Sequence, residues 1–219
     1  MASVSQMALL ATMGASVAPN VVQRVASGSA ARATSTVLTW AAATAGNLIV
    51  IEFVCETNAA APTTPAGYTL WPSGNISNGG TQTLGIFYKI AAGGETGVTI
   101  THGNNATCSI MREISATSGV IEFGTPTVAT TLNPDPPSLT PGGGSKKYLW
   151  IAGADYPTTT ASAYSSGYSN GLTGASTTNL YRVSSAEKTA TGSVEDPGVL
   201  TLGSSVKCVA FTYAISPIS

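Results

Sequence analysis

The chain has 219 residues, of which 9 are basic and 10 are acidic, so its formal net charge is −1. This charged fraction of 9% is well under the usual share of about 25% and supplies no cationic surface for phosphate groups, so nucleic-acid binding is not predicted. No apolar run reaches the roughly 18 residues of a membrane span, and a hydrophobic content of 43% argues against disorder, so the sequence predicts a soluble globular protein without membrane contact.

Residues 1–20 are predicted to form an apolar N-terminal arm. Its length and small residues resemble a secretory signal, but no Lys or Arg precedes the apolar run, so a retained arm is favoured. Apolar side chains of this kind need cover, either from the rest of the domain or from a neighbouring subunit. The predicted interface residues are Met7, Leu9, Leu10 and Met13.

Residues 21–219 are predicted to form an all-β, antiparallel, jelly-roll-like β-sandwich. Helical periodicity is nearly absent, and 24 glycines and 12 prolines punctuate the chain. Runs of β-branched and aromatic residues between turn formers predict about a dozen strands. In chain order these are 21–26, 36–40, 48–54, 68–71, 83–90, 98–101, 107–114, 120–128, 148–154, 179–183, 199–202 and 206–215.

A weak internal repeat divides this domain. Leu48-Ile49-Val50 aligns with Leu149-Trp150-Ile151, and Gly67-Tyr68 aligns with Gly167-Tyr168. The predicted halves are 21–132 and 146–219, joined by a Pro- and Gly-rich loop, 133–145, that cannot join a sheet ladder. One pseudo-duplicated sandwich is favoured, and two small separate sandwiches are the alternative.

Two apolar runs, 48–51 and 206–215, are predicted to be central strands. The second run alternates, and its face of small residues from Cys208 to Ala214 requires cover from the arm, a loop or another subunit. Glu52 interrupts the first run, so its carboxylate must be hydrogen-bonded, paired or at a sheet end.

No motif predicts an enzyme, a metal site or a cofactor. The three cysteines, Cys55, Cys108 and Cys208, have no CxxC spacing and are predicted to be buried free thiols. His102, the one histidine, lies in a turn-like sequence and is predicted to be solvated there. A pair of catalytic carboxylates for a hydrolase could come from Glu52, Glu56, Glu113 and Asp155. Calcium ligands could come from 133–135 or 195–196. Ordinary structural roles are favoured for all of these residues.

Aromatic residues in or beside polar loops give an alternative binding hypothesis. Exposed flat rings can stack on sugar faces, although such rings also pack on their own chain or across interfaces. The possible glycan-binding residues are Trp71, Tyr156, Tyr164 and Tyr168.

Three segments carry a resemblance: Gly46-Asn47-Leu48-Ile49-Val50, Pro65-Ala66-Gly67-Tyr68-Thr69-Leu70, and Leu84-Gly85-Ile86-Phe87-Tyr88-Lys89-Ile90-Ala91. With the closing apolar strand, they resemble a β-sandwich module of virion structural proteins in tailed bacteriophages and prophages, found in capsid-decorating and tail-associated proteins. The resemblance implies a structural role in the virion and does not indicate which part of the particle. Taken with the β-sandwich pattern, the apolar arm and the scarcity of charge, it predicts a capsid cement or decoration protein that stabilises the shell through contacts with the major capsid protein. Exposed sandwich edges favour a homo-oligomer, and the expected location is the virion, with assembly in the bacterial cytoplasm. The alternative is a tail-tip or fibre adhesion module that binds host-surface glycans.

Overall fold

The computed structural model describes residues 17–56, 61–176 and 180–218. The predicted interface side chains Met7, Leu9, Leu10 and Met13 lie outside these ranges.

The predicted C-terminal end of the arm, residue 20, lies inside the folded domain. Val17 forms an antiparallel β-bridge with Ile218, Pro19 is buried, and the first strand begins at Asn20. Residues 17–20 therefore belong to the folded domain.

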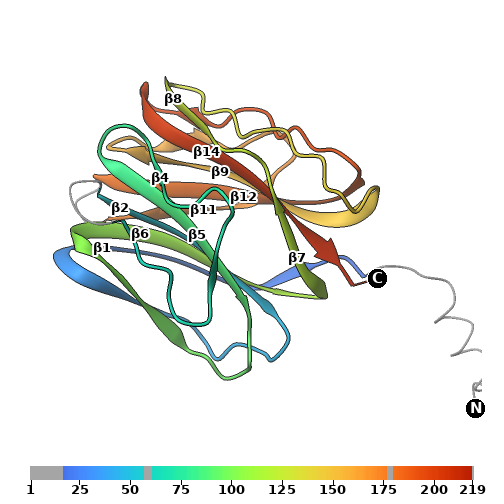
Figure 1. Ribbon diagram of the computed structural model, residues 1–219. Coiled ribbons are helices and arrows are strands. Elements are labelled where there is room, and N and C mark those ends of the chain that lie inside the picture. Colours follow the sequence, from blue (N-terminus) through green and yellow to red (C-terminus); the bar gives the residue numbers. More distant parts are fainter. Residues whose placement is uncertain (1–16, 57–60, 177–179, 219) are drawn as a thin grey trace, which may run out of the picture.

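Two six-stranded antiparallel sheets pack face to face, and the described residues contain no helix (Figure 1). The first sheet has the order β1-β6-β2-β5-β3, with β4 also paired to β5. Its strands are β1 (Asn20–Thr39), β2 (Leu48–Glu56), β3 (Thr69–Leu70), β4 (Ile76–Ser77), β5 (Gln82–Ile90) and β6 (Gly97–Ser115).

The second sheet has the order β11-β12-β9-β14-β7, with β8 also paired to β14. Its strands are β7 (Thr117–Phe123), β8 (Thr127–Thr131), β9 (Lys146–Pro157), β11 (Ser169–Ala175), β12 (Tyr181–Gly192) and β14 (Val206–Pro217). A separate two-stranded antiparallel sheet is formed by β10 (Ala161–Ala163) and β13 (Thr201–Leu202).

The prediction of a β-sandwich with two repeated halves is confirmed. In each half the last strand lies between the first strand and a central strand, so that β6 and β14, β2 and β9, and β5 and β12 are equivalent. Each half completes one sheet before the chain enters the other. The strands therefore do not wind between the sheets as they do in a jelly roll.

The predicted boundary between the halves is wrong. β7 and β8, which the prediction places with the first half, pair with β14 in the second sheet. The halves meet at Ala116, between β6 and β7, and 133–145 is the connection from β8 to β9 within the second half. In both halves the first strand pairs with the last strand, as β1 does with β6. In the second half this pairing places β7 beside β14.

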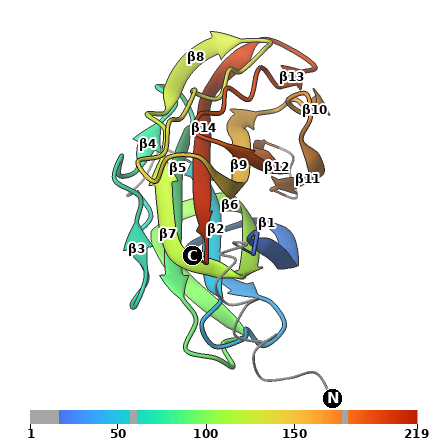
Figure 2. The ribbon, with the colours of Figure 1, turned by 90° about the vertical axis from the view of Figure 1, so that its right-hand side faces the viewer.

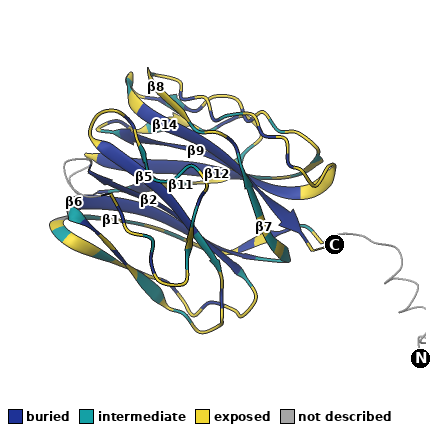
Figure 3. Cartoon of the chain, in the orientation of Figure 1, coloured by how far each residue is buried: buried dark blue, intermediate teal, exposed yellow. Residues whose placement is uncertain are grey.

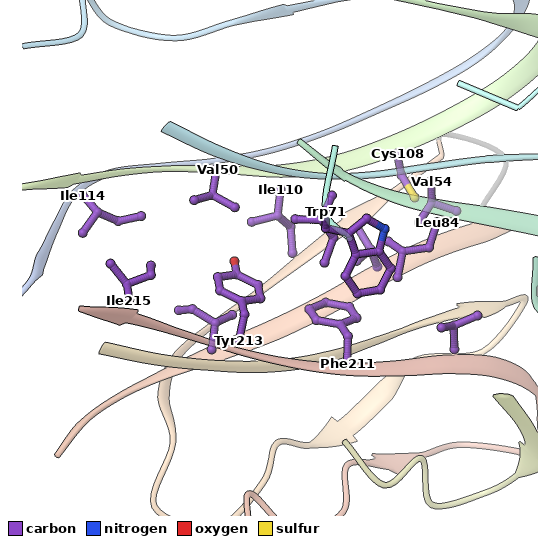
Figure 4. Close-up of a cluster of buried hydrophobic side chains, with 14 of the residues drawn as sticks. Val50, Val54, Trp71, Leu84, Cys108, Ile110, Ile114, Phe211, Tyr213 and Ile215 are labelled. Carbon is purple, nitrogen blue, oxygen red and sulfur yellow. The ribbon is translucent and has the colours of Figure 1, made fainter. Parts of the chain in front are cut away.

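One shared core rules out two separate sandwiches. Val50, Ile110 and Ile114 of the first sheet face Phe211, Tyr213 and Ile215 of the second (Figure 4). Each sheet has its inner face covered only by the other, so neither half has a complete core alone.

Both outer faces are also covered by this chain. Leu38 of β1 and Ile100 of β6 pack over the first sheet against Ile51 and Phe87, because the long β1–β6 ribbon bends over it. Register shifts between Ser29 and Ser35 mark the irregular part of that ribbon.

On the second sheet, the small residues of β14 lie beneath loops. Ala210 packs with Leu200 and Leu202, and Ala214 packs with Leu139. Of the three predicted covers for this face, the structure therefore has the loop. Figure 3 shows the buried strands of both sheets in dark blue and the partly exposed β7 and β8 at one edge.

Candidate functional site

A cluster of ionisable groups lies between the sheets, with the guanidinium of Arg112 at its centre. Its Nη1 donates to Glu52 Oε1 at 2.9 Å, its Nε donates to Glu187 Oε1 at 2.9 Å, and its Nη2 donates to the carbonyl oxygen of Ser185 at 3.2 Å. Arg112, Glu52 and Glu187 are all buried. Because Arg112 and Glu52 belong to the first sheet and Glu187 to the second, the cluster ties the two sheets together.

The two carboxylates of this cluster have further donors. Glu52 accepts from Ser185 Oγ at 2.6 Å and from Tyr213 Oη at 2.8 Å. Burial raises the pKa of Glu52, and this effect exceeds the opposing effects of the Arg112 charge and of these two hydrogen bonds. Glu187 accepts two bonds from Arg24, at 2.8 and 2.6 Å. Burial works to raise the pKa of Glu187, but the Arg24 bonds and the charge of Arg112 outweigh it and lower that pKa. Of the three alternatives expected for Glu52, the structure shows two, because its carboxylate is both hydrogen-bonded and ion-paired.

Asp155 is a second buried acid with a different environment. Its Oδ1 accepts from the backbone N–H of Val209 at 2.5 Å, and its Oδ2 has no hydrogen-bond partner among the described residues. Burial raises the pKa of Asp155 to about 8, and the Val209 bond only partly opposes this. The carboxyl group is therefore protonated at neutral pH.

We expect Asp155 to make folding stability fall with rising pH. The unfolded chain releases this proton near its ordinary pKa of 3.8, whereas the folded protein holds it up to a pKa of about 8. Between these values the folded state binds one more proton, so the free energy of unfolding falls by up to about 1.4 kcal/mol per pH unit. In D155N the carboxyl group is replaced by an amide that does not titrate in this pH range. Urea unfolding across this window should show wild type losing stability relative to D155N, and parallel pH profiles would contradict the assignment.

The prediction of a solvated turn at His102 is wrong. The residue lies within β6 and is buried, with its Nδ1 2.6 Å from the carbonyl oxygen of Gly103 and its Nε2 2.8 Å from Thr36 Oγ1. Burial lowers the pKa of His102. A carbonyl oxygen requires a donor, so Nδ1 carries the proton and Nε2 accepts from the threonine hydroxyl. This arrangement is structural, because both ring nitrogens are occupied by neighbours in the β1–β6 ribbon.

The other candidate acids serve loops rather than a common cleft. Glu113 accepts from the backbone N–H of Thr44 at 2.8 Å and from Asn47 Nδ2 at 2.6 Å, which fixes the loop between β1 and β2. Glu56 pairs with Arg32 at 3.0 Å. Within the described ranges, no three His, Cys, Asp or Glu residues are grouped so as to hold a metal ion. The three cysteines are buried thiols outside any disulfide, as predicted.

Two of the four predicted glycan-binding rings are buried, which contradicts that assignment for them. Trp71 is 1% exposed, its indole N–H donates to the carbonyl oxygen of Gly74, and its ring meets Phe123 edge-on at 5.8 Å. Tyr156 is fully buried and bonds Ser184 Oγ at 2.6 Å. The polar loops beside these residues fold over them. Polar neighbours in the sequence therefore do not indicate that an aromatic side chain is exposed.

The other two rings are partly buried against their own chain. Tyr164 lies on the backbone of Gly171, where an added Cβ would come within 2.2 Å of the ring, and its hydroxyl is 3.1 Å from Thr173 Oγ1. Tyr168 packs beside Trp150 and Tyr148, with Lys188 Nζ 5.7 Å from its ring centroid. Both rings are therefore engaged in packing contacts within their own chain.

Hollows on the described part of the molecule include one beside the ionic cluster and one beside β7. The smaller, about 90 Å³, lies at the end of the ionic cluster beside Arg24, Glu187 and Asn170. The larger, about 440 Å³, follows the end of β7 and is bounded by the loop after Trp71 and by Leu139 and Thr140. The larger one is the site with room for a polypeptide segment.

Comparison with known proteins found no matching family model, no matching curated protein and no matching solved structure. The described residues also contain no helix that is long and apolar enough to cross a membrane.

Proposed function

We propose that this protein is a structural component of a tailed-phage particle, a cement or decoration protein on the outside of the capsid that acts through protein–protein contacts. The observation that carries the proposal is the placement of its reactive groups. Arg112, Glu52, Glu187 and Asp155 lie between the sheets, and His102 lies inside a strand ribbon. Groups held in this way stabilise a fold and do not meet a substrate.

The outer edge supports the same proposal. β7 and β8 are partly exposed, and β8 is an uncharged edge strand of the sequence Thr-Val-Ala-Thr-Thr. Edge strands without charges favour pairing with other polypeptide, which suits a protein whose role is assembly. The proposed partners are the major capsid protein and further copies of this chain, with Met7, Leu9, Leu10 and Met13 in the contact.

The number of copies per particle tests this function. Particles purified from the bacterium that carries the gene should contain hundreds of copies by quantitative mass spectrometry, because a shell offers many equivalent positions. A handful of copies on the tail would instead favour the adhesion module, and absence from the particles would overturn both.

Deleting residues 1–16 provides the matched variant. We expect the shortened chain to lose incorporation into particles while keeping its melting transition, because β1 and the Val17–Ile218 bridge remain intact. Full incorporation of the shortened chain would contradict a contact made by the N-terminal segment.

The glycan-binding alternative has less support. Trp71 and Tyr156 are buried, and Tyr164 and Tyr168 pack on their own chain. The buried rings of Trp71 and Tyr156 lack the free flat face that stacking on a sugar requires.

A further inference from the structure

The larger hollow is a groove along the free edge of a strand. β7 is the last strand of the second sheet, pairing on one side with β14 and with no strand on the other among the described residues. Pro72 and Ser73, from the first sheet's side, and Leu139 and Thr140, from the outer loop, flank this free side. Figures 1 and 2 show β7 as an outlying strand across the end of the sandwich.

The lining of the groove favours an uncharged, partly apolar segment. Pro72, Ile121, Phe123 and Leu139 supply apolar surface, and the free backbone edge of β7 supplies hydrogen-bonding groups. Glu122 is the one charged residue in the lining, and its Oε2 accepts from the backbone N–H of Gly142 at 2.6 Å. One carboxylate oxygen of Glu122 is therefore bound by the loop, and the rest of the lining is uncharged.

The sequence preceding Val17 has the matching chemistry. Residues 1–16 contain no Lys, Arg, Asp or Glu side chain and include Met7, Leu9, Leu10 and Met13. Extended, 16 residues span up to about 55 Å. The segment is long enough to pair with all of β7, whose seven residues span about 23 Å.

The direction of the chain at its exit points to a second molecule. Because Val17 pairs antiparallel with Ile218, the chain at Val17, followed toward its N-terminus, points past the carboxyl end of β14 and away from the groove beside 121–125. Reaching the groove of its own molecule would require the chain to reverse beside its own exit. A neighbouring copy can receive the segment without such a reversal.

We infer that the groove along β7 binds residues 1–16 of a second copy of this chain as an added strand. This inference rests on the proposed function, because it names the contact through which copies join on the particle. Each copy then both donates one strand and accepts one, which joins neighbours in a ring or a chain of subunits.

Photo-crosslinking of the full chain tests the inference. Leu10 is replaced by p-benzoylphenylalanine, and equal amounts of ¹⁵N-labelled and unlabelled protein are mixed before irradiation. The expected products are crosslinks between heavy and light chains, from position 10 to 121–125 or 139–140. Crosslinks confined to one chain, crosslinks elsewhere on the surface, or no crosslinks would each overturn the inference.

A pair of variants provides the control. Thr125 and Thr140 are exposed residues of the groove, and T125R/T140R fills it with two bulky charges. We expect its crosslink yield to fall at least tenfold, whereas T81R/T191R, at exposed threonines outside the groove, keeps the full yield. Thermal melting of both variants checks that the fold is intact, and equal yields from the two would overturn the groove as the acceptor.

The two proposals fail in different ways. Hundreds of copies per particle without these crosslinks would refute the groove contact and leave the particle role standing. The expected crosslinks from a protein absent from particles would refute the particle role and leave the contact standing.

Discussion

Replacing Arg112 with methionine is expected to lower the free energy of unfolding by about 3–5 kcal/mol. The change keeps most of the side-chain volume but removes the cation that contacts both Glu52 and Glu187. Glu52 then has no cationic partner in the cluster and remains buried with only Ser185 and Tyr213 as donors. Urea unfolding followed by tryptophan fluorescence measures the loss.

Two further variants separate charge from volume. R32M breaks the ion pair with Glu56, in which Arg32 is 58% exposed, and is expected to cost less than about 1 kcal/mol. The double variant E52Q/R112M removes both partners of the buried pair and should recover part of the stability lost in R112M. A double variant as unstable as the sum of the single ones would refute coupling between Glu52 and Arg112.

Adding a single methyl group at Gly28 is the second change with a large expected effect. An added Cβ would lie 1.7 Å from the carbonyl oxygen of Ala175, and one at Gly174 would lie 2.3 Å from that of Ser109. Both contacts are to backbone, where β11 of one sheet crosses β1 and β6 of the other, so no side chain can turn aside. We expect G28A and G174A to lose more than the about 1–3 kcal/mol usual for overpacking, or to fail to fold.

G192A is the matched control for these two variants. Gly192 ends β12, and the nearest atom to an added Cβ is the carbonyl oxygen of Val194 at 3.3 Å, in a turn that can yield. Its unfolding midpoint in urea should stay close to that of wild type. If G28A unfolds at the same urea concentration as G192A, the close crossing of the two sheets is not as described.

The sandwich could be predicted because strand periodicity and turn residues are local properties of the sequence. The ends of the strands could not. His102-Gly103-Asn104-Asn105 has the composition of a turn, yet it continues β6, since β1 supplies a partner along the irregular part of the ribbon. The same pairing joins two predicted strands, 21–26 and 36–40, into β1.

The ionic cluster was only half predictable. A carboxylate at Glu52 within an apolar run signals that a partner exists, but Arg112 lies 60 residues away along the chain and Glu187 lies in the other sheet. No local pattern relates these positions. Arg112 and Glu187 are themselves single charges within strands, and taken together with Glu52 they are the signal that would have indicated a buried network.

The prediction that the aromatic residues are exposed failed for a related reason. Trp71 directly follows β3 and precedes a turn, which is an exposed setting when judged by its neighbours in sequence. Its ring is covered by Phe123 of the second sheet, a contact that only the packing of the two halves creates.

The assignment of one sheet to each half has a consequence during synthesis on the ribosome. All strands of the first sheet have been translated by Ser115, but β14, which lies opposite its centre, ends at Pro217. At about 5–20 residues per second, the apolar inner face of the nascent sheet waits roughly 5–20 s for its cover. Neighbouring ribosomes on one messenger expose the same face at the same time, so slow translation of the second half is expected to favour swapped dimers over monomers.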